Sequence, residues 1–305
     1  MRQEALSAVF NLAKQNPKIV FIGSDLGNGT LSQMKEQLPN QFFMEGISEQ
    51  HLIGFAAGLA KEGFIPFLNT IANFFTRRAL EQIILDVCLH KLPVKILGSG
   101  GGMVYAPLGP THTAIDDLAH ILSIPNINVY SPSDAKEMSR IIDSEASSRL
   151  PAYIRFGKGG DEIVSNFLTP SSDSSYSFFG NIFSNRVIIT TGVSLQPAYH
   201  AVRTYPSEDS PLLIHFAKVN IQQSSLRDLL YDKKKILVVE EHQSTGGLLT
   251  QVLHYCQEYN IQTKQIRHIS LGNQFIRKYG SQSDHLSCFG ITTENIRREV
   301  DNLDG

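Results

Sequence analysis

A single carboxylate, Glu49, stands where an apolar stretch gives way to a segment rich in small residues. Residues 52–60 are apolar or small, and they include Gly54 and Gly58. A carboxylate with apolar sequence on both sides costs free energy on burial unless a partner stabilises it. Glu49 is therefore a candidate for acid–base chemistry. The alternative is a structural carboxylate that the helix dipole stabilises at the start of a helix.

The elements that must position this carboxylate follow from an alternation of apolar and amphipathic segments, which is typical of a parallel sheet covered on both faces. In the first half of the chain, strands are expected at residues 19–23, 65–68, 94–98, 127–130 and 152–155. Helices are expected before the first strand and over residues 53–61 and 74–89. In the helix expected over residues 74–89, Ala79, Ile83 and Val87 are spaced for one buried face.

Residues 161–185 differ in character, because a polar run at 169–175 cannot pack a core. This range is predicted to link two domains, at residues 1–160 and 186–305. Further strands are expected in the second domain at residues 186–192, 212–215 and 235–240, with a helix from about Leu195. The sequence thus predicts an α/β protein of two three-layer domains, each with a mostly parallel sheet flanked by helices.

Composition excludes several classes of function. The 305 residues carry a net charge of -2 and one short basic run, at 233–235, so a nucleic-acid surface is not expected. No run of 18 apolar residues indicates a membrane span. Cys88, Cys256 and Cys288 are odd in number and widely spaced, which argues against a disulfide framework or zinc site. Buried free thiols in a reducing cytoplasm fit better.

Several motifs occur in a fixed order over nearly the whole chain, at residues 23–26, 46–60, 74–82, 109–119, 130–134, 153–155 and 239–248. Together they resemble the pyrimidine-binding and C-terminal domains of transketolases and of deoxyxylulose-phosphate synthases. These are thiamine-diphosphate enzymes. The resemblance implies a thiamine-diphosphate-binding fold followed by a domain similar to the C-terminal domain of transketolases.

The resemblance gives Glu49 a catalytic role, the activation of thiamine diphosphate. In this family a carboxylic acid holds ring nitrogen N1′ of the cofactor's aminopyrimidine. That hydrogen bond favours the imino tautomer, whose exocyclic nitrogen takes the thiazolium C2 proton. Losing a hydrogen bond of this kind costs about 1.5–3 kcal/mol.

Two aromatic residues and an arginine follow the strand expected at residues 65–68. The resemblance implies that Phe74 or Phe75 stacks on the aminopyrimidine, and the sequence does not choose between them. Core packing is the alternative for both rings. Arg78 is expected either to line the cofactor pocket or to pair with Glu81 or Glu45.

The resemblance also places polar residues near the substrate and cofactor. His112 matches a family histidine that assists proton transfer at the reacting sugar. Asp25 matches an aspartate near the cofactor, with a turn aspartate as the alternative, and His51 is expected behind the site. Arg2 and Lys158 fall where transketolases clamp the sugar phosphate, with exposed charges as the alternative.

Three positions depart from the family pattern. Leu108 stands where an aspartate reads a substrate hydroxyl, Gly100 replaces a histidine, and Gly29 replaces a phosphate-contacting serine. Their loss suggests a specialised pathway, with modified or nucleotide-linked sugars as substrates. The glycine run at 98–102 lacks the Gly-Lys-Ser/Thr of a P-loop, so it is expected to let the backbone approach cofactor or substrate.

Family enzymes bind the diphosphate through Mg²⁺ on a Gly-Asp-Gly segment of a separate domain, and no such segment occurs here. No metal ligands are therefore expected on this chain. The resemblance implies the small subunit of a split transketolase, in a cytoplasmic A2B2 heterotetramer with a complementary subunit that binds most of the Mg²⁺.

The expected function is transfer of a two-carbon ketol unit from a ketose to an aldehyde. Three alternatives remain open at this point. They are a pyruvate-decarboxylating synthase of the deoxyxylulose-phosphate synthase type, the beta subunit of a 2-oxoacid dehydrogenase, and a non-catalytic assembly subunit.

Overall fold

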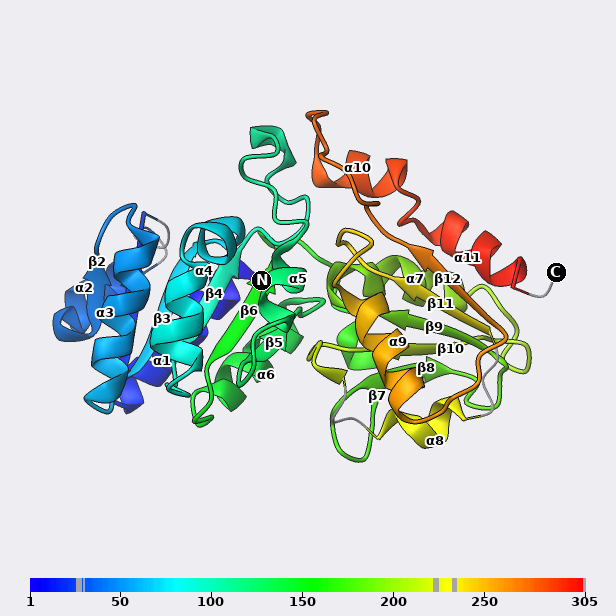
Figure 1. Ribbon diagram of the computed structural model, residues 1–305, viewed down its shortest axis with the longest axis horizontal. Coiled ribbons are helices and arrows are strands. Elements are labelled where there is room, and N and C mark those ends of the chain that lie inside the picture. The colour runs from blue at the N-terminus through cyan, green and yellow to red at the C-terminus, as the bar shows by residue number, and fades with distance from the viewer. Residues whose placement is uncertain (26–28, 30, 222–224, 232–234, 304–305) are drawn as a thin grey trace.

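The computed structural model describes residues 1–25, 29, 31–221, 225–231 and 235–303. The chain forms two α/β domains side by side, each built around a six-stranded sheet (Figure 1). The predicted fold class, with two mostly parallel sheets flanked by helices, is confirmed. Leu26 of the first motif and two residues of the basic run, 233 and 234, lie outside the described residues.

The first sheet is entirely parallel, in the order β2-β1-β3-β4-β6-β5. Its strands are β1 (Ile19–Gly23), β2 (Phe42–Met44), β3 (Ile65–Ile71), β4 (Lys95–Ser99), β5 (Asn128–Tyr130) and β6 (Ala152–Phe156). Strands β1, β4 and β6 are buried along their whole length, which explains their continuous apolar sequence. The helices are α1 (Arg2–Gln15), α2 (Ser32–Gln37), α3 (Glu49–Lys61), α5 (Asp117–Leu122) and α6 (Ala135–Glu145).

The single helix expected over residues 74–89 is wrong in detail. The segment consists of two wider π-helical stretches, η2 (Phe74–Arg78) and η3 (Ile83–Cys88), on either side of the short α4 (Leu80–Gln82). Ala79, Ile83 and Val87 are nevertheless fully buried, as their spacing predicted. π-Helical turns are rare and recur at functional sites, and here the first one carries the aromatic residues of the candidate site.

The second sheet has the order β12-β11-β9-β10-β8-β7. Its strands are β7 (Thr169–Pro170), β8 (Ser177–Gly180), β9 (Arg186–Thr190), β10 (Leu212–His215), β11 (Lys235–Val239) and β12 (Gln265–Ile269). The covering helices are α7 (Leu195–Val202), α8 (Leu226–Leu230), α9 (Leu248–Glu258), α10 (Gln282–Cys288) and α11 (Thr293–Asp301).

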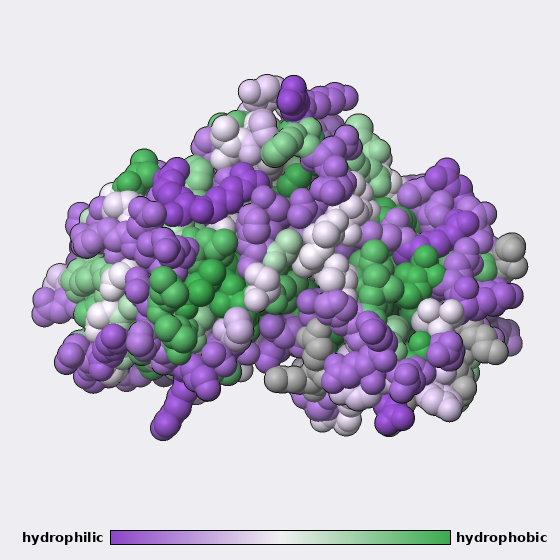
Figure 2. All heavy atoms as spheres, in the orientation of Figure 1, coloured by the Kyte–Doolittle hydropathy of each residue, from purple (hydrophilic) through white to green (hydrophobic). Residues whose placement is uncertain are grey.

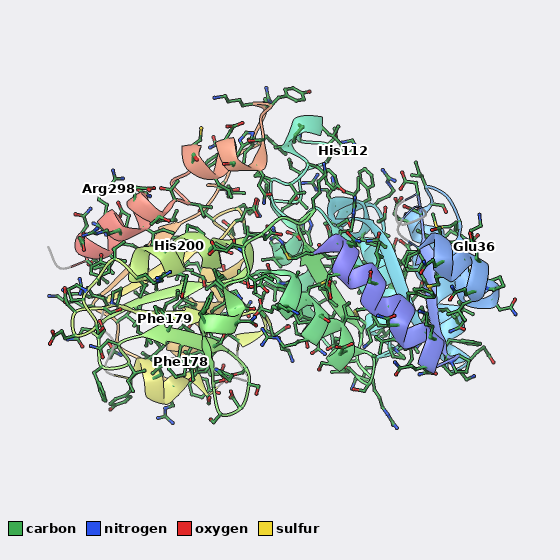
Figure 3. All side chains as sticks on the ribbon, turned by 180° about the vertical axis from the view of Figure 1, so that it is seen from behind. Glu36, His112, Phe178, Phe179, His200 and Arg298 are labelled. Carbon is green, nitrogen blue, oxygen red and sulfur yellow. The ribbon has the colours of Figure 1, made fainter. Side chains whose placement is uncertain are left out.

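The prediction that residues 161–185 only link the domains is wrong, because this range supplies β7 and β8 to the second sheet. Strand β8 runs antiparallel to β10, and its neighbouring phenylalanines pack on opposite faces of the sheet (Figure 3). Phe179 contacts Tyr199 of α7 at 4.9 Å between ring centroids. The sequence does not reveal β8, because only two of its four residues are apolar and a polar run precedes it.

The two domains share packing and backbone hydrogen bonds. One apolar cluster contains Val129 and Tyr153 of the first domain together with Phe216 and Val219 of the second. The amide of Val219 donates to the carbonyl oxygen of Val129 at 2.8 Å. The domains therefore form a continuous core at this edge.

The three cysteines are free, as expected. Cys88 and Cys256 are buried, but Cys288 is exposed at the end of α10, so the expectation of three buried thiols is wrong for Cys288. None of the described helices has the length and apolar character needed to cross a membrane.

Candidate active site

Glu49 begins helix α3 at the carboxyl edge of the first sheet, directly after strand β2. Its side chain is fully buried, and the residue as a whole is 1% exposed. The hydroxyl of Thr70, near the end of β3, donates to Glu49 Oε1 at 3.3 Å. Parallel strands place their carboxyl ends at one edge, where ligands bind in open α/β sheets. The buried carboxylate thus lies where a site is expected.

The second partner of Glu49 is Arg78, whose guanidinium donates to Oε2 at 2.5 Å. Of the two alternatives for Arg78, pairing with Glu81 or Glu45 is not observed, because the π-helical turn directs its side chain toward Glu49. The guanidinium carbon also lies 4.4 Å from the centre of the Phe74 ring. One planar cation therefore contacts both a buried carboxylate and the face of an aromatic ring.

The structure separates the two candidate aromatic residues. Phe75 is fully buried among core residues that include Ile53 and Ala56. Phe74 is half-buried and meets the imidazole of His112 edge-to-face, with 5.4 Å between ring centroids. Phe74, rather than Phe75, has a face available to a ligand beside Glu49.

A chain of hydroxyl groups leads from Glu49 to the surface. The Oγ atom of Ser24 lies 2.8 Å from Thr70 Oγ1 and 2.8 Å from Asp25 Oδ1. Ser24 and Thr70 are buried, whereas Asp25 is exposed. Because each hydroxyl can both donate and accept, the chain can pass a proton between the buried and exposed carboxyl groups. Neither Ser24 nor Thr70 was singled out from the sequence, although each is a polar residue near the end of an apolar strand.

His112 lies on the loop that rises above the first domain (Figure 3). Its Nδ1 is 2.9 Å from the hydroxyl of Thr111, and the side-chain amide of Asn73 donates to the carbonyl oxygen of Thr111 at 2.6 Å. The loop is thereby tied to the start of η2, which carries Phe74. His51 instead stacks against Phe55 on the surface of α3.

Tyr105 lies near the two cations expected at the substrate phosphate, Arg2 and Lys158, and near Asp25, which is expected close to the cofactor. Its hydroxyl interacts with the Arg2 side chain, and Lys158 Nζ lies 5.5 Å from its ring centre. Burial raises the pKa of Tyr105, and the negative charge of Asp25 also raises it, whereas Arg2 acts to lower it. Two cations thus converge at one point beside the site. Sequence reasoning missed Tyr105, which carries no motif of its own.

The glycine run does not lie open to a ligand, so the expectation that it approaches cofactor or substrate is wrong. A Cβ on Gly100, at φ +80, would lie 2.1 Å from the Tyr105 ring. A Cβ on Gly102, at φ +66, would lie 2.3 Å from the Glu241 carboxyl carbon. Protein side chains therefore occupy the space that these glycines leave. Leu108 is 51% exposed in the loop that follows.

A second buried carboxylate, Glu241, joins the two domains behind this run. Its Oε1 accepts hydrogen bonds from the amide of Met103 at 2.9 Å and from Gln282 Nε2 at 2.8 Å. Arg155 pairs with Asp117 at 3.1 Å and donates to the Glu241 carbonyl oxygen. Burial raises the pKa of Glu241 to about 7, against the attraction of Arg155. The network fixes the glycine run to the second domain.

The pKa of the adjacent Glu240 is shifted in the opposite direction to that of Glu241. The Glu240 carboxylate accepts hydrogen bonds from the amides of Leu248 and Leu249 and from His268. Burial acts to raise its pKa, but the hydrogen bond from His268 and the charge of His242 hold the pKa below its usual value. Across the part of the chain that the structure describes, no group of three His, Cys, Asp or Glu residues is arranged to hold a metal ion.

Residues 1–160 match the family described as "Transketolase, pyrimidine binding domain". The chain is 32% identical over 301 residues to 1-deoxy-D-xylulose-5-phosphate synthase of Syntrophus aciditrophicus, covering 96% of this chain and 45% of that protein. It is 32% identical over 295 residues to the same enzyme of Lawsonia intracellularis, covering 94% and 45%. The chain thus spans about half the length of these curated relatives.

Among solved structures, one described as "Split gene transketolase, inactive beta4 tetramer" superimposes with a TM-score of 0.81 and 28% identity. The match covers 99% of this chain and 97% of that one. The transketolase of Campylobacter jejuni shares the fold, with a TM-score of 0.79 at 14% identity over 98% of this chain and 46% of that one.

Proposed function

Because the chain belongs to the family of transketolase pyrimidine-binding domains, we propose that it supplies the pyrimidine half of a thiamine-diphosphate active site. A complementary subunit would supply the diphosphate half. The match to a split-gene transketolase chain over nearly its full length supports this division. The part of this chain that the structure describes offers no metal-binding cluster, so Mg²⁺ would be held mainly by the partner.

The observation that carries the proposal is the position of the Arg78 guanidinium. It is a flat, cationic hydrogen-bond donor that binds Glu49 Oε2 while lying over the Phe74 ring. A protonated aminopyrimidine has the same three properties, so it could take the position that the Arg78 guanidinium holds between Glu49 and Phe74. The Arg78 side chain is 46% exposed, which leaves it free to move aside for a ligand.

When bound, thiamine diphosphate would supply a nucleophilic carbon that cleaves and forms carbon–carbon bonds. Glu49 would hold a proton at the pyrimidine ring nitrogen, and the chain through Thr70 and Ser24 would connect that proton to Asp25. Phe74 would orient the ring by stacking. His112, which contacts Phe74, would move protons at the substrate oxygen.

The substrate end of the site would be formed around Tyr105. Arg2 and Lys158 both reach this residue, and two cations suit the phosphate of a sugar phosphate. The exposed Leu108 cannot hydrogen-bond a sugar hydroxyl, which supports a modified or nucleotide-linked sugar in a specialised pathway.

Transfer of a two-carbon ketol unit from a ketose to an aldehyde is the reaction that we propose. A second candidate, condensation of pyruvate with an aldehyde, is supported by the identity to deoxyxylulose-phosphate synthases. Supplying the assembled enzyme with xylulose 5-phosphate or pyruvate as donor, with one aldehyde acceptor, separates the two. Turnover of the ketose without release of CO₂ supports ketol transfer, and CO₂ release from pyruvate contradicts it.

The partner would cover an apolar surface of the first domain. Figure 2 shows apolar side chains gathered over the segment between β3 and β4, where Ile84, Leu85 and Leu89 are exposed. Exposed patches of this kind mark protein interfaces. An A2B2 heterotetramer would bury two such patches.

The free thiols of the chain support a reducing, cytoplasmic compartment.

Calorimetry tests the division of the site. Thiamine diphosphate with Mg²⁺ is titrated into this chain alone, into a subunit that carries a Gly-Asp-Gly segment, and into their mixture. The proposal predicts tight binding only to the mixture. Absence of binding to a mixture that elutes as one complex would instead support a non-catalytic assembly subunit.

A further inference from the structure

A cavity of about 400 Å³ lies between the two domains and is lined by none of the residues of the Glu49 site. Helix α6 and strand β5 of the first domain form one wall, and β7, β8 and the end of β10 form the other (Figure 1). Its size falls in the range of small-molecule sites, which occur preferentially at domain interfaces.

The cavity carries excess positive charge from Arg140 on α6 and Lys218 after β10. Neither has a carboxylate within ion-pair distance among the residues that the structure describes. The Arg140 guanidinium donates to the hydroxyl of Ser165 at 3.1 Å. Burial lowers the pKa of Lys218, and the charge of the more distant Glu145 acts against this.

The acidic groups nearby already have partners. Glu137 accepts hydrogen bonds from the Ser133 amide at 2.7 Å and from His215 Nε2 at 3.0 Å. Glu145 is bound by the buried Lys95 at 2.9 Å and by the hydroxyl of Tyr130 at 2.7 Å. The charges of Arg140 and Lys218 are therefore left for a ligand.

Hydrogen-bond donors and apolar contacts complete the cavity. Within the described part of the chain, the hydroxyls of Ser144 and Ser177, which line it, make no hydrogen bond. Ile141 and Leu168 contribute apolar walls. Two cations and two hydroxyl donors match the charge and the oxygen atoms of a phosphate dianion, and an arginine fork suits phosphate geometry.

We propose that this cavity binds a small phosphorylated metabolite. Arg140 and Lys218 hold its phosphoryl group, and its carbon skeleton lies against Ile141 and Leu168. Because Arg140 and Lys218 come from different domains, the ligand joins the two domains beside the point where Tyr130 and Lys218 already form a β-bridge between them. This binding needs neither thiamine diphosphate nor a partner subunit, so it stands apart from the proposed function.

Titration calorimetry on the full chain tests the proposal, with inorganic phosphate and glycerol 3-phosphate as probes at constant ionic strength. Arg140→Gln and Lys218→Gln should each weaken binding about tenfold or more, because each removes a charge-assisted hydrogen bond. Arg149→Gln and Lys136→Gln remove exposed charges outside the cavity and serve as matched controls that should bind as the parent does. Thermal unfolding without probe checks that all four variants fold.

The candidate phosphate clamp at Arg2 and Lys158 must be separated from this cavity. The double variant Arg2→Gln, Lys158→Gln should keep the binding event that Arg140→Gln weakens. The proposal is overturned if the double variant alone loses binding, or if neither probe shows saturable binding up to about 10 mM. It is also overturned if succinate binds as tightly as glycerol 3-phosphate. If Arg140→Gln does not fold, unchanged binding in Lys218→Gln is sufficient to overturn it.

Discussion

Replacing Glu241 with glutamine should stabilise the protein at alkaline pH and leave it nearly unchanged at acidic pH. The carboxyl is buried between the domains, and burial raises its pKa from 4.5 to about 7. A carboxyl whose pKa is higher in the folded state than in the unfolded state stabilises the fold fully at a pH below its unfolded-state pKa. This contribution disappears as the pH rises through its folded-state pKa. The stability of the parent protein should therefore fall between pH 4.5 and 7 on account of Glu241.

The size of the effect follows from the shift. A difference of about 2.5 pKa units at about 1.36 kcal/mol each gives about 3 kcal/mol. Glutamine keeps an oxygen that accepts from Met103 and Gln282, so the hydrogen bonds survive while the charge is removed. The stability gain of Glu241→Gln over the parent should grow by up to about 3 kcal/mol between pH 5 and pH 8.

Urea unfolding at pH 5, 6, 7 and 8 measures this gain. The neighbouring Glu240→Gln is the matched control, because the pKa of Glu240 is held below its usual value. The ionised Glu240 carboxylate stabilises the fold above pH 4.5, and this contribution is lost as the pH falls. Glu240→Gln should therefore destabilise the protein at pH 7. A Glu241→Gln variant that is equally destabilised at all four pH values would refute the reasoning.

Four further substitutions test the site and the glycine run at residues 98–102. Phe74→Ala should weaken cofactor binding in the complex with little change in melting temperature. Phe75→Ala should instead cost about 3–5 kcal/mol of stability in urea unfolding, because its ring is fully buried. Equal effects of the two variants in both assays would contradict the assignment of Phe74 to the cofactor and Phe75 to the core. Gly102→Ala, at φ +66 and against a buried carboxyl, should cost about 2 kcal/mol or more in the same assay. Arg78→Gln leaves the buried Glu49 without its ion-pair partner and should destabilise the isolated chain by about 1–2 kcal/mol, less than for a fully buried pair because Arg78 is half exposed. A smaller loss when saturating cofactor and partner are present would support replacement of the guanidinium by the cofactor.

Much of the fold could be predicted from the sequence, because buried parallel strands are continuous apolar runs. Strands β1, β4 and β6 were expected within one or two residues of their observed bounds. Strand β8 could not be predicted because it is short, has only two apolar residues and follows a polar run. The π-helical turns at Phe74–Arg78 and Ile83–Cys88 were missed because their residues also fit an ordinary helical pattern.

The candidate site could be predicted only as a set of residues. Side-chain direction depends on the π-helical turn, so sequence could not choose between Phe74 and Phe75 or pair Arg78 with Glu49. The glycine run was interpreted as a ligand surface because glycine alone does not say what fills the space beside it. Here that space holds Tyr105 and other protein side chains.

Turnover of the assembled enzyme tests the role of Glu49 most directly. Glu49→Gln is compared with Glu36→Gln, which changes an exposed acid on α2, in complexes that elute identically on size exclusion. Loss of the proton-holding carboxyl should lower turnover by about 10²–10⁴-fold, while Glu36→Gln keeps the parent rate. Turnover of Glu49→Gln equal to that of the parent would contradict the account.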